Sequence, residues 1–262
     1  MSFTKSLLIL FLLSFFSFPV IAQQGSADQG TNRHISPDEI VLVAGATGRT
    51  GSLVVQQLKG FGYTNILGMT RSREKAILEY GTGIKWVEGD VRDPQSLQRV
   101  FKGVDRVISA IGSDREPGNG TEVVEYLGLK NMADAALENG VKVLVVTSSS
   151  GVTHEDHELN KFADNILIWK FKGEEYLRNS GMNYSIVRAG GLKPEIPGGQ
   201  YGIYLAQGDD GRAGQISIAD VASVLIEAAN NPEAHDKTYE TFNYVTRYPA
   251  AWPDTFAMLQ KD

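Results

Sequence analysis

The residues best suited to chemistry are Gly45, Gly48 and Gly51 in the segment GATGRTG. They follow an apolar run at 39–44 and precede a segment with helical spacing at 52–58. In such a strand–turn–helix unit, the glycines permit the tight turn, the approach of the backbone to a pyrophosphate, and close helix–strand packing. Free N–H groups at the helix start, aided by the helix dipole, then favour bound phosphate. The sequence therefore predicts a dinucleotide-binding loop made of Gly45, Thr47, Gly48, Arg49, Thr50 and Gly51.

The end of the second predicted strand indicates which dinucleotide this loop would hold. Arg71 follows that strand, with Arg73 and Lys75 close behind. An acidic residue here would accept a hydrogen bond from a free ribose 2′-hydroxyl, whereas a guanidinium suits a 2′-phosphate. The alternative interpretation is a solvated basic helix start, although basic groups there oppose the helix dipole unless an anion is bound. We therefore expect Arg71 and the neighbouring Ser72 to bind NADP(H) in preference to NAD(H).

A regular alternation of strands and helices would position these residues. Compact apolar runs predict strands at residues 39–44, 65–69, 85–91, 104–111, 141–147, 183–188 and 237–245. Helical spacing and capping residues predict helices at residues 52–58, 72–80, 121–138, 162–179, 217–230 and 253–259, with another beginning at Asp93. Strands joined by helices of this length require right-handed crossovers and a parallel sheet that is covered on both faces. We therefore predict a single-domain α/β fold, a doubly wound parallel sheet of the Rossmann type.

Composition narrows the class of protein. The chain has 262 residues, of which 42% are hydrophobic and 21% are charged, so it can bury a core and is not largely disordered. The formal net charge of −6 argues against a general nucleic-acid binder. The chain contains no cysteine, which excludes disulfides, thiolate zinc sites and a cysteine nucleophile. We expect a small-molecule substrate, no metal, and a monomer or small homo-oligomer.

The first 22 residues have the order of a secretory signal peptide. Lys5 supplies a positive charge, residues 7–18 are almost wholly apolar, and Ala22 ends a possible cleavage site. Residues 23–38 are polar and predict a short linker before the domain at 39–262. We therefore expect export to a periplasmic or secreted location. Two alternatives stay open: an uncleaved segment would anchor the protein to a membrane, and a misassigned start would leave it cytoplasmic.

Six segments, in order along the chain, carry a family resemblance. They are VAGATGRTG (43–51), MTRSREKA (69–76), EGDVRDPQSL (88–97), VISAIG (107–112), NGVKVLVVTSSSG (139–151) and NILIWKFKGEEYLRNSGMNYSIVRAGGL (165–192). With them the chain resembles the short-chain dehydrogenase/reductase superfamily, in its atypical NAD(P)H-binding branch of NmrA-like and biliverdin-reductase-like proteins. The last segment is similar to a plant and cyanobacterial group of NAD(P)-binding proteins.

The resemblance implies cofactor contacts after the third, fourth and sixth strands, beside the adenine, the ribose and the nicotinamide in turn. In that order the residues are Asp90 and Val91; Ala110, Ile111 and Gly112; and Ala189 and Gly190. The family's lysine, which holds the ribose, matches Lys170.

The catalytic pair is where the sequence departs from that superfamily. The position four residues before Lys170 is Ile166, and not the tyrosine that passes a proton to the reacting oxygen. Tyr126 and Lys130 have the tyrosine–lysine spacing on another helix, which we interpret as a chance pair. Of the serines that end the fifth strand, Ser149 is the candidate catalytic residue beside Lys170 and would bond substrate or cofactor, although serines at a strand end are also ordinary turn donors.

Two function classes follow from these features. The first is an NADPH-dependent reductase of a small planar or quinone/flavin-like substrate, with the proton supplied by solvent or substrate. The second is a non-catalytic NADP(H)-binding sensor or partner-binding protein, and a third interpretation keeps the fold without the cofactor. Residues 191–215 predict a substrate lid or partner loop. His154 and His157 have a spacing that could hold a metal, but a polar loop before a helix explains them as well.

Overall fold

The computed structural model describes residues 36, 38–114, 116–211, 214–244 and 252–262. Eight strands form one sheet in the spatial order β3-β2-β1-β4-β5-β6-β10-β8, and β7 pairs with β9 in a small second sheet. The strands are β1 (Val41–Ala44), β2 (Ile66–Thr70), β3 (Lys85–Glu88), β4 (Arg106–Ser109), β5 (Val143–Ser149), β6 (Tyr184–Ala189), β7 (Gly191–Lys193), β8 (Gly202–Ala206), β9 (Gln215–Ser217) and β10 (Lys237–Tyr244). The predicted doubly wound α/β fold is confirmed, because every pairing of the main sheet except β8 with β10 is parallel.

The helices begin where the sequence offers capping groups. Ser72, Asp93 and Ser217 each accept a backbone N–H with the side chain at the start of a helix, as predicted. The helices are α1 (Arg49–Gly60), α2 (Arg73–Tyr80), α3 (Pro94–Phe101), η1 (Glu122–Gly128), α4 (Leu129–Glu138), α5 (Glu158–Phe162), α6 (Ile166–Arg178), α7 (Ile218–Asn230), η2 (Pro232–Ala234) and α8 (Trp252–Ala257). The helix predicted at 121–138 thus opens as a π-helix, η1, and the one predicted at 162–179 is divided between α5 and α6.

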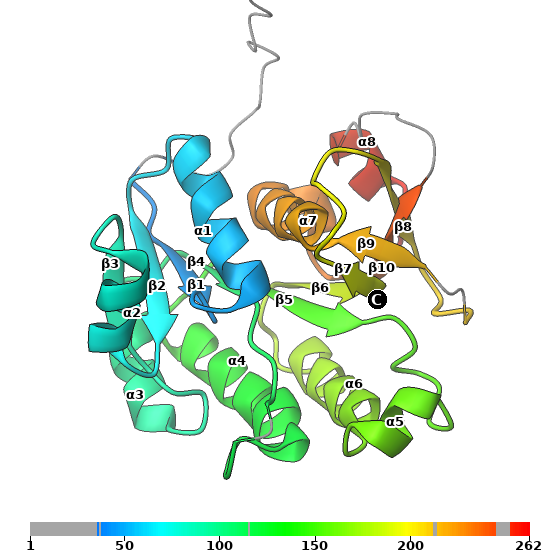
Figure 1. Ribbon diagram of the computed structural model, residues 1–262, viewed down its shortest axis with the longest axis horizontal. Coiled ribbons are helices and arrows are strands. Elements are labelled where there is room, and N and C mark those ends of the chain that lie inside the picture. The colour runs from blue at the N-terminus through cyan, green and yellow to red at the C-terminus, as the bar shows by residue number, and fades with distance from the viewer. Residues whose placement is uncertain (1–35, 37, 115, 212–213, 245–251) are drawn as a thin grey trace, which may run out of the picture. The chain divides into compact units, whose positions relative to one another are not determined.

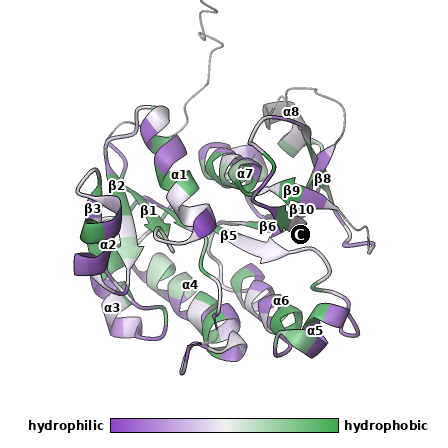
Figure 2. Ribbon diagram, viewed as in Figure 1, coloured by the Kyte–Doolittle hydropathy of each residue, from purple (hydrophilic) through white to green (hydrophobic). Residues whose placement is uncertain are grey.

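The helices cover both faces of the sheet. Figure 1 shows α1 and α7 on one face and α4 and α6 on the other. Alternate residues of β1 reach the two cores: Val41 and Val43 face the α1 and α7 side, whereas Leu42 and Ala44 face the α4 side. All four residues are almost fully buried, and in Figure 2 β1 is hydrophobic along its length while α2 carries many hydrophilic residues. A strand buried on both faces is the expected centre of such a sheet.

The prediction of an entirely parallel sheet was wrong at one edge. Residues 191–215, expected as a loop, contain β7 and β8, and β8 runs antiparallel to β10 with Tyr204 opposite Phe242. Among the described residues, no helix lies between β6 and β8 to return the chain across the sheet, so β8 runs opposite to β6 and to β10, which is parallel to β6. The expected lid is therefore partly built into the sheet edge.

The N-terminal predictions concern residues that the structure does not describe. The signal peptide at 1–22 and most of the linker at 23–38 lie outside the described residues. Among the residues that are described, no helix is both long enough and apolar enough to span a bilayer.

Candidate functional site

The glycine loop between β1 and α1 is compact because its glycines touch neighbouring backbone. Gly45 has φ of +77°, and a Cβ atom there would lie 2.8 Å from the carbonyl oxygen of Ala110. A Cβ atom on Gly51 would lie 2.1 Å from the carbonyl oxygen of Gly45. The loop therefore admits only glycine at these two positions without movement of the backbone.

The start of α1 is left open to an anion. Gly48 precedes the helix in an extended conformation, no side chain caps its N-terminus, and the first turn carries no acidic residue. The first N–H groups of a helix have no partner within the helix, and the helix dipole places positive charge there. Because the loop leaves these donors uncovered, the residues present fit the phosphate groups of a dinucleotide.

A crevice of about 200 Å³ opens beside this loop. It lies where β1 and β4 are neighbours, and there the order of the strands reverses. Such a switch point is the usual ligand site of a doubly wound sheet. The residues of the predicted site that line it are Gly45, Thr47, Gly48, Arg71, Asp90, Val91, Ala110, Ile111 and Gly112. Further lining residues, which the sequence did not single out, include Met69, Asp114, Asn119 and Val124.

Other predicted residues are not among those that line the crevice: Arg49, Thr50, Gly51, Ser72, Ser149, Lys170, Ala189 and Gly190. The hydroxyl of Ser72 is committed to capping α2, and the hydroxyl of Ser149 donates to the carbonyl of Ser150. A Cβ atom on Gly190 would lie 2.6 Å from the Phe242 ring, so packing alone explains that glycine. The residues expected beside the adenine and the ribose thus line one crevice with the loop, and Lys170 lines a cavity that shares Ile111 and Val124 with it.

Arg71 reaches the crevice but is already paired. Its guanidinium lies 3.5 Å from the Asp114 carboxylate and 3.4 Å from the Glu116 carboxylate, in the segment after β4. The side chains of Arg71 and Asp114 are 47% and 41% exposed, so water screens the pair. Arg71 is therefore held at the crevice by contacts that a stronger anion could replace.

Lys170 makes a buried ion pair that the sequence did not indicate. Its ammonium donates to the Glu125 carboxylate at 2.6 Å, with side-chain exposures of 15% and 4%. The backbone N–H and the hydroxyl of Ser113 donate to the other Glu125 oxygen, both at 2.7 Å. Burial acts to raise the pKa of Glu125, but Lys170 and Ser113 outweigh it and hold the pKa below its ordinary value. Glu125 thus stays ionised and fixes the position of Lys170.

The geometry of two helices explains this pair. Glu125 lies in the π-helix η1, and π-helical turns are often found at functional sites. A Cβ atom on Gly173 of α6 would lie 2.4 Å from the Glu125 carbonyl oxygen, so η1 and α6 approach with their backbones almost in contact. Lys170 lies one turn earlier on α6, which brings its ammonium to the Glu125 side chain.

A small cavity of about 20 Å³ adjoins Lys170 and Glu125 under the ends of β4 and β5. Ser109 and Ser148 also line it, and the buried Ser148 hydroxyl has no hydrogen-bond partner among the described residues. The volume suffices for about one water molecule. Ser148 lines this cavity together with Lys170, whereas Ser149 is not among its lining residues.

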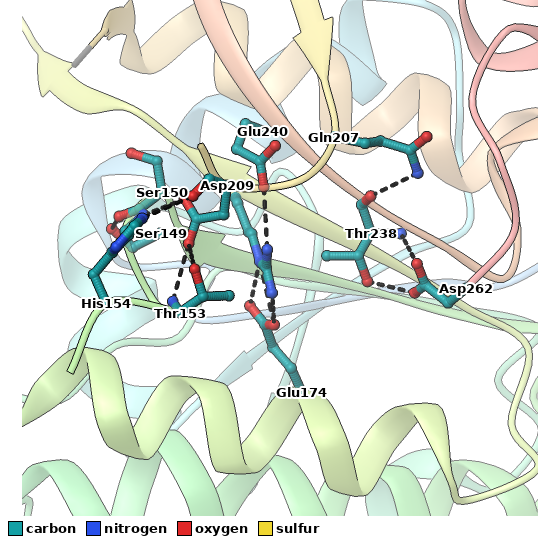
Figure 3. Close-up of polar contacts among 12 residues, drawn as sticks. Ser149, Ser150, Thr153, His154, Glu174, Gln207, Asp209, Thr238, Glu240 and Asp262 are labelled. Carbon is teal, nitrogen blue, oxygen red and sulfur yellow. Dashed lines mark hydrogen bonds and ion pairs between the residues drawn. The ribbon is translucent and has the colours of Figure 1, made fainter. Parts of the chain in front are cut away.

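The end of β5 is also tied to the insertion before β9. The buried Asp209 carboxylate accepts hydrogen bonds from the N–H of Gly151 at 2.6 Å and from the N–H and hydroxyl of Thr153 at 3.0 and 2.8 Å. His154 bonds to the Asp209 carbonyl oxygen, and Figure 3 shows Thr153 and His154 converging on Asp209. Burial acts to raise the pKa of Asp209, but these hydrogen bonds hold it below its ordinary value. The segment around Asp209 is thus bound to the residues that directly follow Ser149 and Ser150.

Three charged residues, Arg188, Glu174 and Glu240, form a buried triad. Arg188 of β6 donates to Glu174 of α6 at 2.7 Å and to Glu240 of β10 at 3.1 Å. Figure 3 shows the carboxylates of Glu174 and Glu240 on opposite sides of the guanidinium that they bind. Breaking such a pair strands a buried charge, so the triad fixes α6 against the sheet.

Other residues singled out in the sequence have structural roles. The His157 ring accepts the N–H of Leu159 and caps α5, which agrees with a polar loop before a helix. Tyr126 stacks on Trp169 with ring centroids 6.2 Å apart. Lys130 bonds to Asp134, so Tyr126 and Lys130 do not act as a pair.

Comparison with known proteins also indicates a protein that binds NAD(P)H. A family model described as NAD(P)H-binding matches residues 45–232. Sanguinarine reductase of Eschscholzia californica is 32% identical over 240 residues, covering 76% of this chain and 87% of that protein. An uncharacterized chloroplastic protein of Arabidopsis thaliana is 34% identical over 223 residues, covering 76% of this chain and 68% of that protein. Among solved structures, the anaerobillin reductase ChuY from Escherichia coli O157:H7 shares the fold, with a TM-score of 0.67, 21% identity, and coverage of 80% of this chain and 99% of that one.

Proposed function

Because the chain belongs to the NAD(P)H-binding family, in the atypical branch of the short-chain dehydrogenases/reductases, we propose that it is an NADP(H)-dependent reductase of a small planar or quinone/flavin-like substrate. The observation that supports this most is the crevice at the strand switch point, where the open start of α1, Arg71 and the segment after β4 meet. Similarity to sanguinarine reductase favours reduction over other uses of the cofactor.

Different residues along the crevice would bind different parts of the coenzyme. The N–H groups at the start of α1 hold the diphosphate, and Val91 and Ile111 offer apolar surface to the adenosine. Arg71 offers the two parallel donors that suit the 2′-phosphate. When bound, NADPH supplies the hydride, and the protein contributes orientation and electrostatics.

The reacting end lacks the usual acid. Ile166 stands where the superfamily has tyrosine, so no phenol is available at that position of α6. Lys170, held by Glu125, would orient the nicotinamide ribose, and solvent or the substrate would supply the proton. Quinone-like and flavin-like acceptors suit such a site because their reduced forms accept protons from water.

A second candidate function is an NADP(H)-binding protein without turnover, which engages a partner. The missing phenol at Ile166 is the specific observation that favours it. In that protein the coenzyme would stabilise a surface and would never be oxidised.

Two measurements separate these candidates. The purified protein is titrated with NADPH and NADH by calorimetry, and then NADPH oxidation is followed with panels of quinones and flavins. The reductase proposal expects saturable NADPH binding and turnover with at least one acceptor. Binding without oxidation by any acceptor favours the second candidate, and no binding of either coenzyme rejects both. Lys170→Ala should lower turnover or coenzyme affinity, and no change in either would remove Lys170 from the site.

We also propose that residues 1–22 direct the protein out of the cytoplasm. The apolar run at 7–18 and the cleavage site ending at Ala22 support this. Cell fractionation with N-terminal sequencing of the mature chain tests it. A chain that keeps Met1 in the soluble cytoplasmic fraction would refute it.

A further inference from the structure

We propose that Asp114 is a specificity-determining residue, which competes with the 2′-phosphate for Arg71 and offers an acceptor to the 2′-hydroxyl of NAD(H). The proposal rests on the proposed coenzyme site. Asp114 and Arg71 both line the crevice, and their charged groups are 3.5 Å apart. The acid that often follows the second strand in NAD-binding proteins is thus supplied here from the segment after β4.

The Asp114 carboxylate is held in place before any coenzyme arrives. One oxygen accepts the N–H of Glu116 at 2.8 Å, and the polar side chain of the buried Asn119 acts to lower the pKa of the carboxyl. These groups, with the charge of Arg71, hold the pKa of Asp114 below its ordinary value, so it is ionised at neutral pH. The other oxygen faces Arg71. A fixed, ionised acceptor beside the crevice is what recognition of a ribose hydroxyl requires.

NADH and NADPH would then interact differently with Asp114 and Arg71. A 2′-hydroxyl can donate to Asp114 while Arg71 keeps its place. A 2′-phosphate gains a bidentate contact with Arg71, which replaces the exposed pairs with Asp114 and Glu116. It also meets the negative charge of Asp114, which the N–H of Glu116 keeps in position. Arg71 therefore favours NADPH, Asp114 favours NADH, and we expect the wild-type preference for NADPH to be modest.

Glu116 has a lesser part in this competition. Its side chain is 68% exposed and it is not among the residues that line the crevice. It pairs with Arg71 at 3.4 Å without the supporting bonds that hold Asp114. Removing its charge should therefore have a smaller effect than removing that of Asp114.

The test compares Kd values of NADPH and NADH for the wild type, Asp114→Asn, Glu116→Gln and Arg71→Ala at low and moderate salt. We expect Asp114→Asn to bind NADPH roughly five- to tenfold more tightly, as contact-range Coulomb repulsion in a wet site implies, and to bind NADH no more tightly than the wild type. Arg71→Ala should weaken NADPH roughly tenfold or more and leave NADH almost unchanged. The Asp114→Asn gain should shrink as salt is raised.

The matched control is Asp38→Asn, an exposed acid that precedes β1 and so lies at the opposite edge of the parallel strands. It removes the same charge and should leave both Kd values unchanged. If Asp114→Asn changes both coenzymes equally, or neither, Asp114 is not a selector although the coenzyme site stands. If the wild type binds neither coenzyme, the proposed function itself is wrong.

Discussion

Replacing Glu125 with glutamine should destabilise the protein by about 3 kcal/mol at neutral pH, the scale for removing one partner of a buried ion pair. The Glu125 side chain is 4% exposed, and its ion-pair partner among the described residues, Lys170, is 15% exposed. Glutamine is nearly isosteric and can still accept the N–H of Ser113, so the loss reports mainly the uncompensated charge of Lys170. Since Lys170 is slightly exposed, water in the cavity can relieve part of the cost.

The interaction energy of Glu125 and Lys170 can be measured in a double-mutant cycle by denaturant unfolding. The four proteins are the wild type, Glu125→Gln, Lys170→Met and the double variant. The double variant should be more stable than Glu125→Gln, because it buries no unpaired charge. Glu175→Gln, at an exposed position of the same helix α6, is the control and should change stability by less than about 0.5 kcal/mol. A Glu125→Gln protein as stable as the wild type would refute the view that Glu125 anchors Lys170.

The pH dependence gives an independent check on the same residue. The folded protein holds the pKa of Glu125 below the ordinary value of 4.5, despite the opposing effect of burial. Its stabilising contribution is therefore present above that value and is lost as the pH falls through the folded pKa. The wild type should lose stability in this acid range more steeply than Glu125→Gln. Parallel curves for the two proteins would contradict the assignment.

Two further predictions concern the loop and a histidine. Gly51→Ala should destabilise the protein by about 3 kcal/mol, because its Cβ would meet the Gly45 carbonyl, whereas Gly60→Ala meets nothing and serves as control in thermal unfolding. Burial, with Arg106, lowers the pKa of His235 from 6.5 to about 4. Unfolding free energy should therefore fall between pH 6.5 and 4, by up to about 3 kcal/mol, and His235→Gln should remove that part of the decline in urea titrations.

The parts of the fold that the sequence predicts are those set by nearby residues. The caps at Ser72, Asp93 and Ser217 act within two or three positions of themselves, so their side chains identify helix starts directly. Gly51 meets the backbone of the loop itself, and Gly45 meets backbone that directly follows the adjacent strand β4. The crevice follows from the strand order, since the alternation of strands and helices leaves few topologies to consider.

The parts that the sequence missed depend on contacts between distant segments. Glu125 and Lys170 are 45 residues apart, and nothing local distinguishes Glu125 from the exposed acids of the same helix. The extra residue of the π-helix shifts the helical spacing, so a regular pattern does not place Glu125 toward α6. β8 was missed because Gly and Pro residues around it indicate a loop, and its pairing with β10 is set by the sheet edge.

The two ion pairs of the site differ in strength, and this decides which contacts of the segment after β4 a ligand can replace. Ser113 is fixed by the buried Glu125 carboxylate, whereas the next residue, Asp114, contacts Arg71 across an exposed pair. Exposed pairs contribute roughly 0–1 kcal/mol, and breaking a buried one costs several times more. A phosphate that draws Arg71 away should therefore break the exposed pair with Asp114, and leave Ser113 and Lys170 in place. Coenzyme preference and the position of Lys170 can thus vary independently, although their controlling residues are adjacent in the chain.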